Sequence, residues 1–200
     1  MKTGNPFIFN CTTCKTRCDG KSKGVYNFKN DVVFAEEQEN IIIQKINDNP
    51  NYFAKKTTEA GYPDIEIFNF DNILVSYLEI KAQRRTFMSV EKTLPHSNLK
   101  ASETLALNLS DLLRYFNIEK ETKIPTSILW VVMNRPCLVA YNKKRFFYQK
   151  TNQLKEIYLK EKNKRRFKRE SGKGDIVNGI HKGVTVNYHF SINELIEWKK

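Results

Sequence analysis

Three charged side chains lie within one short stretch of the sequence, residues 64–81. They are Asp64, Glu79 and Lys81, and strand-like segments lie on both sides of an Asp-Asn pair at 71–72. Because Asp and Asn tolerate the backbone of a two-residue turn, the stretch predicts a β-hairpin. Pairing outward from that turn sets Asp64 opposite Glu79, with Lys81 on the same face. Two carboxylates placed so close repel each other unless a cation or a proton lies between them.

These residue types suit metal-assisted hydrolysis of a phosphodiester. Paired carboxylates are hard oxygen ligands for Mg²⁺, whose shell is then completed by substrate phosphate and water. A lysine beside them can orient or deprotonate the attacking water and can contact phosphate. The simpler alternative is a surface hairpin with an ordinary Glu/Lys pair. In either case we expect Leu74, Leu78 and Ile80 to point to the other face, into the core.

The same residues resemble a known motif. Pro63-Asp64, followed after fourteen residues by Glu79-Ile80-Lys81, is similar to the motif of the PD-(D/E)xK nuclease superfamily. That superfamily includes type II restriction endonucleases, archaeal Holliday-junction resolvases and many repair nucleases. The resemblance covers roughly residues 31–141. It implies an α/β fold with a restriction endonuclease-like core, α-β-β-β-α-β, in which helices flank a central mixed β-sheet.

The resemblance also implies roles for further residues. It assigns the metal to Asp64, Glu79 and an acidic residue on the first helix, for which Glu39 has the most suitable spacing, 25 positions before Asp64. Lys81 would position the nucleophile, and Gln83 would support the metal site or the DNA backbone. The implied cofactor is Mg²⁺, for which Mn²⁺ can substitute.

We therefore expect a metal-dependent DNA endonuclease, and a type II restriction endonuclease acting as a homodimer is the leading subtype. A Holliday-junction resolvase of a phage or mobile element is the next. An RNA-processing nuclease, or a non-catalytic DNA-binding module with the same fold, remains an alternative, because fold analogy alone does not choose among them.

The cysteines indicate a second possible metal site. Cys11, Cys14 and Cys18 lie within eight residues, and the fourth cysteine is Cys137. Zn²⁺ takes four ligands, so Cys137 or a histidine could complete a structural site. The alternative is a loop of reduced cysteines. We divide the chain into a Cys-rich segment, 1–30, and a nuclease domain, 31–200.

The charge favours a polyanionic partner. The 200 residues carry a formal net charge of +12, and the basic excess is concentrated in residues 143–173. Nucleic acid is the expected partner of such a surface, although a lysine-rich genomic composition explains part of the excess. We interpret 143–173 as a basic helix and arm. The residues predicted to contact DNA are Arg84, Arg85, Lys143, Lys144, Arg145, Arg165, Arg166, Lys168 and Arg169.

The other elements follow from periodicity and turn signals. The longest apolar run, 128–133, is far too short to span a bilayer, and no signal peptide is visible, so we expect a cytoplasmic protein of a bacterium or phage. The predicted elements are a helix at 31–48 capped by Asp31, a helix at 102–116, strands at 126–133 and 137–141, a helix at 151–169, a strand within 181–192 and a short terminal helix.

Overall fold

The computed structural model describes residues 28–83, 86–133, 135, 137–139, 143–168, 176–177, 180–181 and 186–199. Several predictions concern residues outside these ranges. They are the predictions for Cys11, Cys14, Cys18, Arg84, Arg85 and Arg169.

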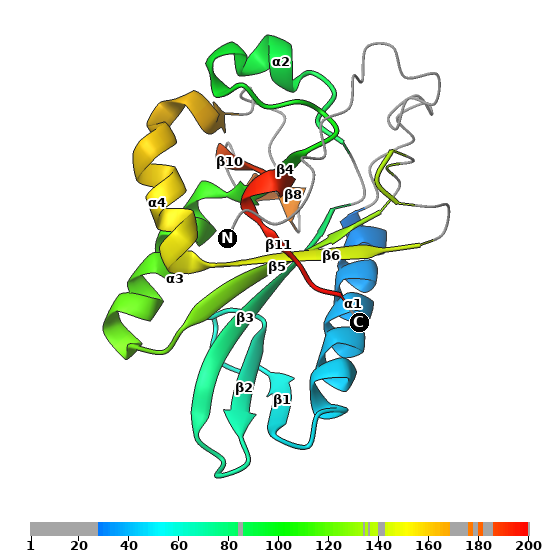
Figure 1. The fold of residues 1–200 in the computed structure, drawn as a ribbon, viewed down its shortest axis with the longest axis vertical. Helices are drawn as coiled ribbons and strands as arrows, with labels where there is room; N and C mark the ends of the chain where they lie inside the picture. The colour runs from blue at the N-terminus through cyan, green and yellow to red at the C-terminus, as the bar shows by residue number, and fades with distance from the viewer. Residues whose placement is uncertain are drawn as a thin grey trace.

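A six-stranded mixed sheet forms the centre of the described fold (Figure 1). The strands β3 and β5 run parallel, and the other neighbouring pairs run antiparallel. In sheet order the strands are β1 (Tyr52–Lys56), β2 (Ile65–Asn69), β3 (Leu74–Gln83), β5 (Thr126–Val132), β6 (Arg145–Lys150) and β11 (Ile196–Glu197).

Helices cover both faces of this sheet. On one face Ile42 of α1 (Phe28–Asn47) packs in a core cluster with Ile80 of β3. On the other face α3 (Leu109–Thr122) and α4 (Thr151–Glu161) bury Leu112 and Leu154 in a cluster with Trp130 of β5. Figure 1 shows α1 on one side of the sheet and α3 and α4 on the other. The order α1-β1-β2-β3-α3-β5 confirms the predicted core.

A smaller antiparallel sheet is inserted between these elements, and part of it corrects the predicted helix at 102–116. Residues 104–108 are a strand, and the helix begins only at Leu109. The reason is tertiary: Leu105 and Leu107 are buried at a spacing of two, in a strand paired to β10. The sheet order is β4 (Thr104–Asn108), β10 (Val186–Ser191) and β7 (Arg166–Lys168), with α2 (Val90–Thr93) and the 3₁₀ turn η1 (Pro95–Ser97) nearby.

The basic region is also more segmented than predicted. The helix expected at 151–169 ends at Glu161, because Lys162 has a positive φ of 47° that a right-handed helix cannot continue. The 3₁₀ turn η2 (Lys162–Arg165) and strand β7 follow. Residues 137–139 form a turn and bend rather than part of a strand.

The strand predicted within 181–192 is β10, but the terminal helix is replaced by η3 (Ile192–Glu194) and β11. A two-stranded ladder joins β8 (Ile176–Val177) and β9 (Ile180–His181). Across the residues that the structure describes, no helix has the length and apolar character needed to cross a membrane.

Candidate active site

The hairpin brings the predicted residues together, although its turn differs from the prediction. Ile65 pairs with Leu78 and Ile67 with Ser76, which confirms the predicted register near the charged residues. At the tip the loop has three residues, 70–72, because the Asn69 N–H donates to the Ile73 carbonyl at 3.0 Å. Such a loop ends in a left-handed residue, and Asn72 has φ 58°.

A β-bulge reconciles the longer loop with the predicted register. Phe68 pairs with Leu74 while Ile67 pairs with Ser76, so one residue of β3 is left over between the two pairs. Beyond the bulge the register is the predicted one. Leu78 and Ile80 pack against α1 as expected, but Leu74 packs in the cluster on the opposite face, because the extra residue reverses the alternation.

Asp64 lies immediately before β2 and is tied to β3. The backbone N–H of Ile80 donates to Asp64 Oδ2 at 2.8 Å. Burial, followed by the charge of Glu79, raises the pKa of Asp64 from 3.8 to about 7. The carboxyl is therefore held beside Glu79 in surroundings that disfavour two negative charges.

Glu79 is the most deeply buried acid of the site, with only 2% of the residue exposed. Its Oε1 forms an ion pair with Lys81 Nζ. Its Oε2 is buried, and no group in the described part of the chain meets hydrogen-bond geometry with it, although the Tyr115 hydroxyl lies close enough to the Glu79 carboxylate for their interaction to raise the tyrosine pKa. A buried carboxylate oxygen without a donor is costly, so this atom is suited to receive a cation.

Lys81 lies between two acids. Its Nζ contacts Glu79 and lies 3.9 Å from Asp111 Oδ2. Burial lowers the pKa of Lys81, but the charges of Glu79, Asp111 and Asp64 outweigh that effect and raise the pKa above its usual value. The side chain thus carries an ammonium group among three carboxylates.

Glu39 reaches the site from α1. Its Oε2 pairs with Lys56 Nζ of β1 at 3.0 Å. Its charge is the smallest of the causes that raise the pKa of Asp64. Glu39 therefore lies near the metal-ligand candidates, as the sequence predicted, but it has a cationic partner of its own.

The sequence analysis missed a contribution from α3. Asp111 lies in the first turn of this helix, and Arg114 Nη2 donates to Asp111 Oδ1 at 2.8 Å. Tyr115 is buried beneath them, and burial and the Glu79 carboxylate both raise its pKa. Placing the helix start at 102 hid the signal, because an acid in the first turn of a helix is otherwise a recognisable feature.

Gln83 lies at the end of β3, where its amide contacts the backbone of β4. Its Oε1 accepts from the Ala106 N–H at 3.0 Å, and its Nε2 donates to the Thr104 carbonyl at 3.3 Å. Both ends of the amide are therefore used to join β3 to the backbone of β4. Through these contacts Gln83 positions the end of β3, and a supporting role at the metal site stays a prediction.

The basic residues of 143–168 divide into anchored and exposed groups. Lys144 Nζ donates to Gln38 Oε1 at 2.7 Å, and Arg145 Nε pairs with Glu197 Oε1 at 2.7 Å. These contacts hold β6 to α1 and β11. The exposed members of the predicted DNA-contacting set, within the described residues, are Lys143, Arg166 and Lys168.

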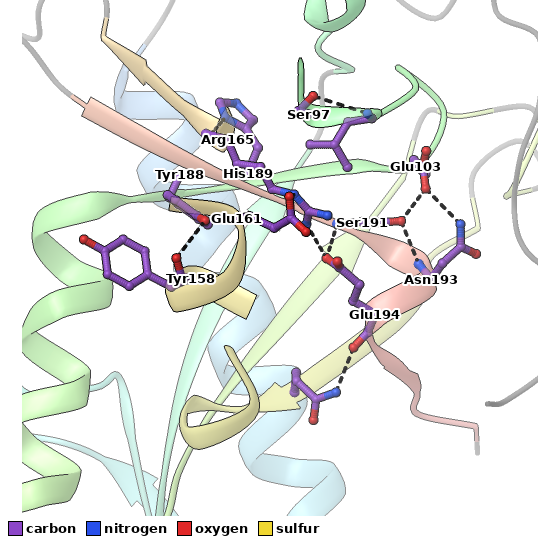
Figure 2. Close-up of polar contacts among 12 residues, drawn as sticks. Ser97, Glu103, Tyr158, Glu161, Arg165, Tyr188, His189, Ser191, Asn193 and Glu194 are labelled. Atoms are coloured by element: carbon purple, nitrogen blue, oxygen red, sulfur yellow. Dashed lines mark hydrogen bonds and ion pairs between the residues drawn. The ribbon is translucent and has the colours of Figure 1, made fainter. Parts of the chain in front are cut away.

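Arg165 corrects the prediction of a basic arm at this point. It is 7% exposed, and its Nη1 pairs with Glu194 Oε2 at 2.6 Å. Figure 2 shows this pair beside Ser191, whose N–H also donates to Glu194 Oε2 at 2.9 Å. Arg165 thus belongs to a buried polar network that fixes η2 against β10. In this position its guanidinium is not available to a DNA phosphate.

The zinc prediction gains no support from the described residues. Cys137 lies half-buried in the turn after β5, and its three predicted partners lie outside the described ranges. Among the described residues, no group of three or more His, Cys, Asp or Glu side chains could hold a metal by itself. His189, one alternative ligand, is buried and stacks on Phe87, and burial lowers its pKa to about 4.

Comparison with solved structures gives two matches of low sequence identity. No protein-family model and no curated protein matches the sequence. One neighbour is the Holliday junction resolvase Hjc of Archaeoglobus fulgidus, with 8% identity, a TM-score of 0.43, and coverage of 82% of this chain and 91% of that chain. The other is a nuclease from a fusselovirus, with 10% identity, a TM-score of 0.38 and coverage of 84% of each chain.

Proposed function

We propose that the protein is a Mg²⁺-dependent nuclease that hydrolyses phosphodiester bonds of DNA. The observation that carries the proposal is the pairing of Asp64 with the buried Glu79. The pKa of Asp64 is raised to about 7, and Glu79 Oε2 is buried without a donor among the described residues. A divalent cation would offset the repulsion between the two carboxylates and would give the buried Glu79 Oε2 a partner.

The two carboxylates suit Mg²⁺ better than they suit a metal whose ligands are all supplied by the protein. Mg²⁺ is commonly bound through one or two carboxylates and keeps positions for phosphate and water. Asp64 and Glu79 would hold the ion. When bound, the ion would offset charge on the phosphate and lower the pKa of water. Glu39 would assist from α1.

The chain's own residues would orient the reactants. Ile80 fixes the Asp64 carboxylate through its backbone N–H. The Lys81 ammonium would donate hydrogen bonds to the attacking water or to a phosphate oxygen. In the reaction the water oxygen bonds to phosphorus and loses a proton to solvent, one ester P–O bond breaks, and the departing oxygen takes up a proton from solvent.

DNA is the proposed substrate because of the net charge of +12 and the exposed cations of β7. Lys/Arg contacts to phosphates displace counterions, so binding should weaken as salt rises. RNA has the same phosphate chemistry, so the test includes RNA as a substrate, and cleavage of RNA is one of its outcomes. A homodimer, which two-fold symmetric cleavage would favour, is part of the proposal.

The test uses purified protein with supercoiled plasmid, linear duplex, four-way junction DNA and RNA, each with Mg²⁺ or EDTA. Asp64→Asn and Lys81→Met are compared with Asp48→Asn, a control in an exposed residue just after α1. We expect Mg²⁺-dependent cleavage that both site variants lose and the control keeps. Discrete duplex fragments would indicate a restriction-type enzyme, and paired nicks in the junction a resolvase. Binding without cleavage of any substrate would reject catalysis and favour a DNA-binding module.

A further inference from the structure

We propose that Arg114 of α3 binds a backbone phosphate of the DNA beside the candidate active site. This inference rests on the proposed function and extends it. It assigns to α3 a DNA-contacting residue that neither the motif at 63–81 nor the basic stretch at 143–173 contains.

The first argument is that Arg114 is connected to the motif lysine through one carboxylate. Asp111 Oδ1 accepts from Arg114 Nη2 at 2.8 Å, and Asp111 Oδ2 lies 3.9 Å from Lys81 Nζ. The guanidinium and the ammonium therefore lie on two sides of the same acid. Arg114 and Lys81 are separated by a single carboxylate, so Arg114 can reach the same DNA strand on which Lys81 would act.

The second argument is that Arg114 also borders the loop that leads into Asp64. A Cβ built at Gly61 would lie 3.7 Å from Arg114 Cδ, so the arginine stem packs against this loop. The guanidinium lies 5.4 Å from the centre of the Tyr115 ring, whose phenol is close to Glu79. The arginine is thus held by α3 and lies against the loop before the catalytic carboxylate.

The third argument is the exposure of the group. The Arg114 side chain is 44% exposed, whereas the Asp111 side chain is 17% exposed. The acid is therefore largely covered, and the cation faces solvent. By contrast, the Arg165 side chain is 8% exposed and paired with Glu194. Of these two arginines, only Arg114 combines closeness to the site with access to a ligand.

An ion pair three residues apart on a helix surface is common and contributes little to stability, so the pair alone would indicate nothing. What distinguishes Arg114 is that its acid also faces the motif lysine and that its stem packs against the 61–64 loop. A guanidinium has five N–H donors in a planar fork. The contacts with Asp111 and with the Tyr115 side chain use part of that fork, and the remaining donors suit the oxygens of a phosphate.

The experiment measures DNA binding and its salt dependence in Ca²⁺ in place of Mg²⁺, and Mg²⁺ cleavage in parallel. The probe is a fluorescently labelled form of whichever DNA the wild-type protein cuts. Arg114→Gln and Arg114→Lys are compared with Lys120→Gln. Lys120 is exposed on the same helix, and the glutamine substitution changes the net charge equally. Six residues separate the two positions, which places them about 9 Å apart along the axis and on different sides of the helix.

We expect Arg114→Gln to weaken binding about tenfold or more and to reduce the slope of log K against log salt by about 1. Arg114→Lys should keep most of the slope, because it keeps the charge, but should bind more weakly than wild type because the fork is lost. Lys120→Gln should resemble wild type. Equal losses in Arg114→Gln and Lys120→Gln would show a general charge effect and overturn the inference.

Unchanged binding in Arg114→Gln would also overturn the inference while leaving the nuclease proposal intact, provided that wild type binds and cuts. If wild type neither binds nor cuts DNA, the nuclease proposal itself is rejected, and the inference is rejected with it. Circular dichroism and urea unfolding of each variant separate a binding defect from a folding defect. A loss of binding together with a loss of folded structure in Arg114→Gln alone would assign Arg114 a structural role.

Discussion

The backbone N–H of Ile80 donates a hydrogen bond to Asp64 Oδ2 at 2.8 Å. Ile80 stands between Glu79 and Lys81, so the hydrogen bond aligns the first carboxylate with the other two charged groups. Asp64 precedes β2 and has no position in the sheet ladder. The Thr57 N–H donates to the Asp64 carbonyl at 2.9 Å and holds its backbone, while the contact to Ile80 fixes its carboxylate.

The pH dependence of stability follows from the raised pKa of Asp64. In the folded protein this pKa is about 7, against 3.8 for an ordinary Asp carboxyl, so between these pH values the folded state holds a proton that the unfolded state has released. The contribution of Asp64 is thus fully present below pH 3.8 and is lost as pH rises to about 7. The unfolding free energy of the metal-free protein should fall across this range, by at most about 1.4 kcal/mol per pH unit before solvent screening.

The measurement is urea unfolding in EDTA at a series of pH values. Asp64→Asn should remove this part of the pH dependence, and Asp48→Asn should leave it. Mg²⁺ should stabilise wild type more at and above neutral pH than in acid, because the ion binds only the folded state and competes with the proton on Asp64. A wild-type profile that coincides with that of Asp64→Asn would contradict the prediction.

Lys81→Met should separate the two roles of the lysine. The substitution leaves Glu79 buried without its cation, which should cost about 3 kcal/mol in EDTA, since breaking a buried pair exposes the remaining charge to a low dielectric. Mg²⁺ should restore much of that loss, while cleavage stays absent. Urea unfolding with and without Mg²⁺ measures the first effect, and plasmid cleavage measures the second.

The matched control for that variant is Lys56→Met. Lys56 pairs with Glu39 at 3.0 Å, and its side chain is 45% exposed. Its loss should cost roughly 0–1 kcal/mol. Similar destabilisation of the two variants, or no rescue of Lys81→Met by Mg²⁺, would argue against Glu79 as a metal ligand.

Glu39→Gln should reduce cleavage about 10- to 100-fold, the usual effect of removing a partner that supports metal ligands. The charge of Glu39 acts on Asp64, whereas Glu37, two residues earlier on α1, is exposed. Glu37→Gln is therefore the control and should cut like wild type. Initial cleavage rates over a range of Mg²⁺ concentrations decide the matter, and equal rates for the two variants would remove Glu39 from the site.

Gln83→Ala should act through the fold. It removes two hydrogen bonds to the backbone of β4, which should lower the unfolding free energy by about 1–3 kcal/mol. The Mg²⁺ concentration for half-maximal cleavage should stay at the wild-type value. Gln153→Ala, in an exposed residue of α4, is the control. A large shift in the Mg²⁺ requirement without a loss of stability would instead indicate a direct role at the metal.

The arrangement of the motif hairpin was accessible from the sequence because its determinants are local. Strand alternation and the turn at 71–72 predicted the register that pairs Ile65 with Leu78. The details of the tip were not accessible. The three-residue loop shifts the pairing by one residue relative to the prediction, and the bulge shifts it back by one. The charged residues lie beyond the bulge, where the predicted register holds.

Only tertiary structure decided the elements that depend on distant partners. The run 104–108 matches a helical pattern in the sequence, but it becomes a strand because β10, about 80 residues later, pairs with it. That change moves the helix start to Leu109 and brings Asp111 to Lys81. Arg165 likewise looks like part of a basic surface until Glu194 pairs with it. The sequence alone determined which charges the hairpin brings together, because strand alternation is local; pairing between distant segments decided which other charges lie beside them.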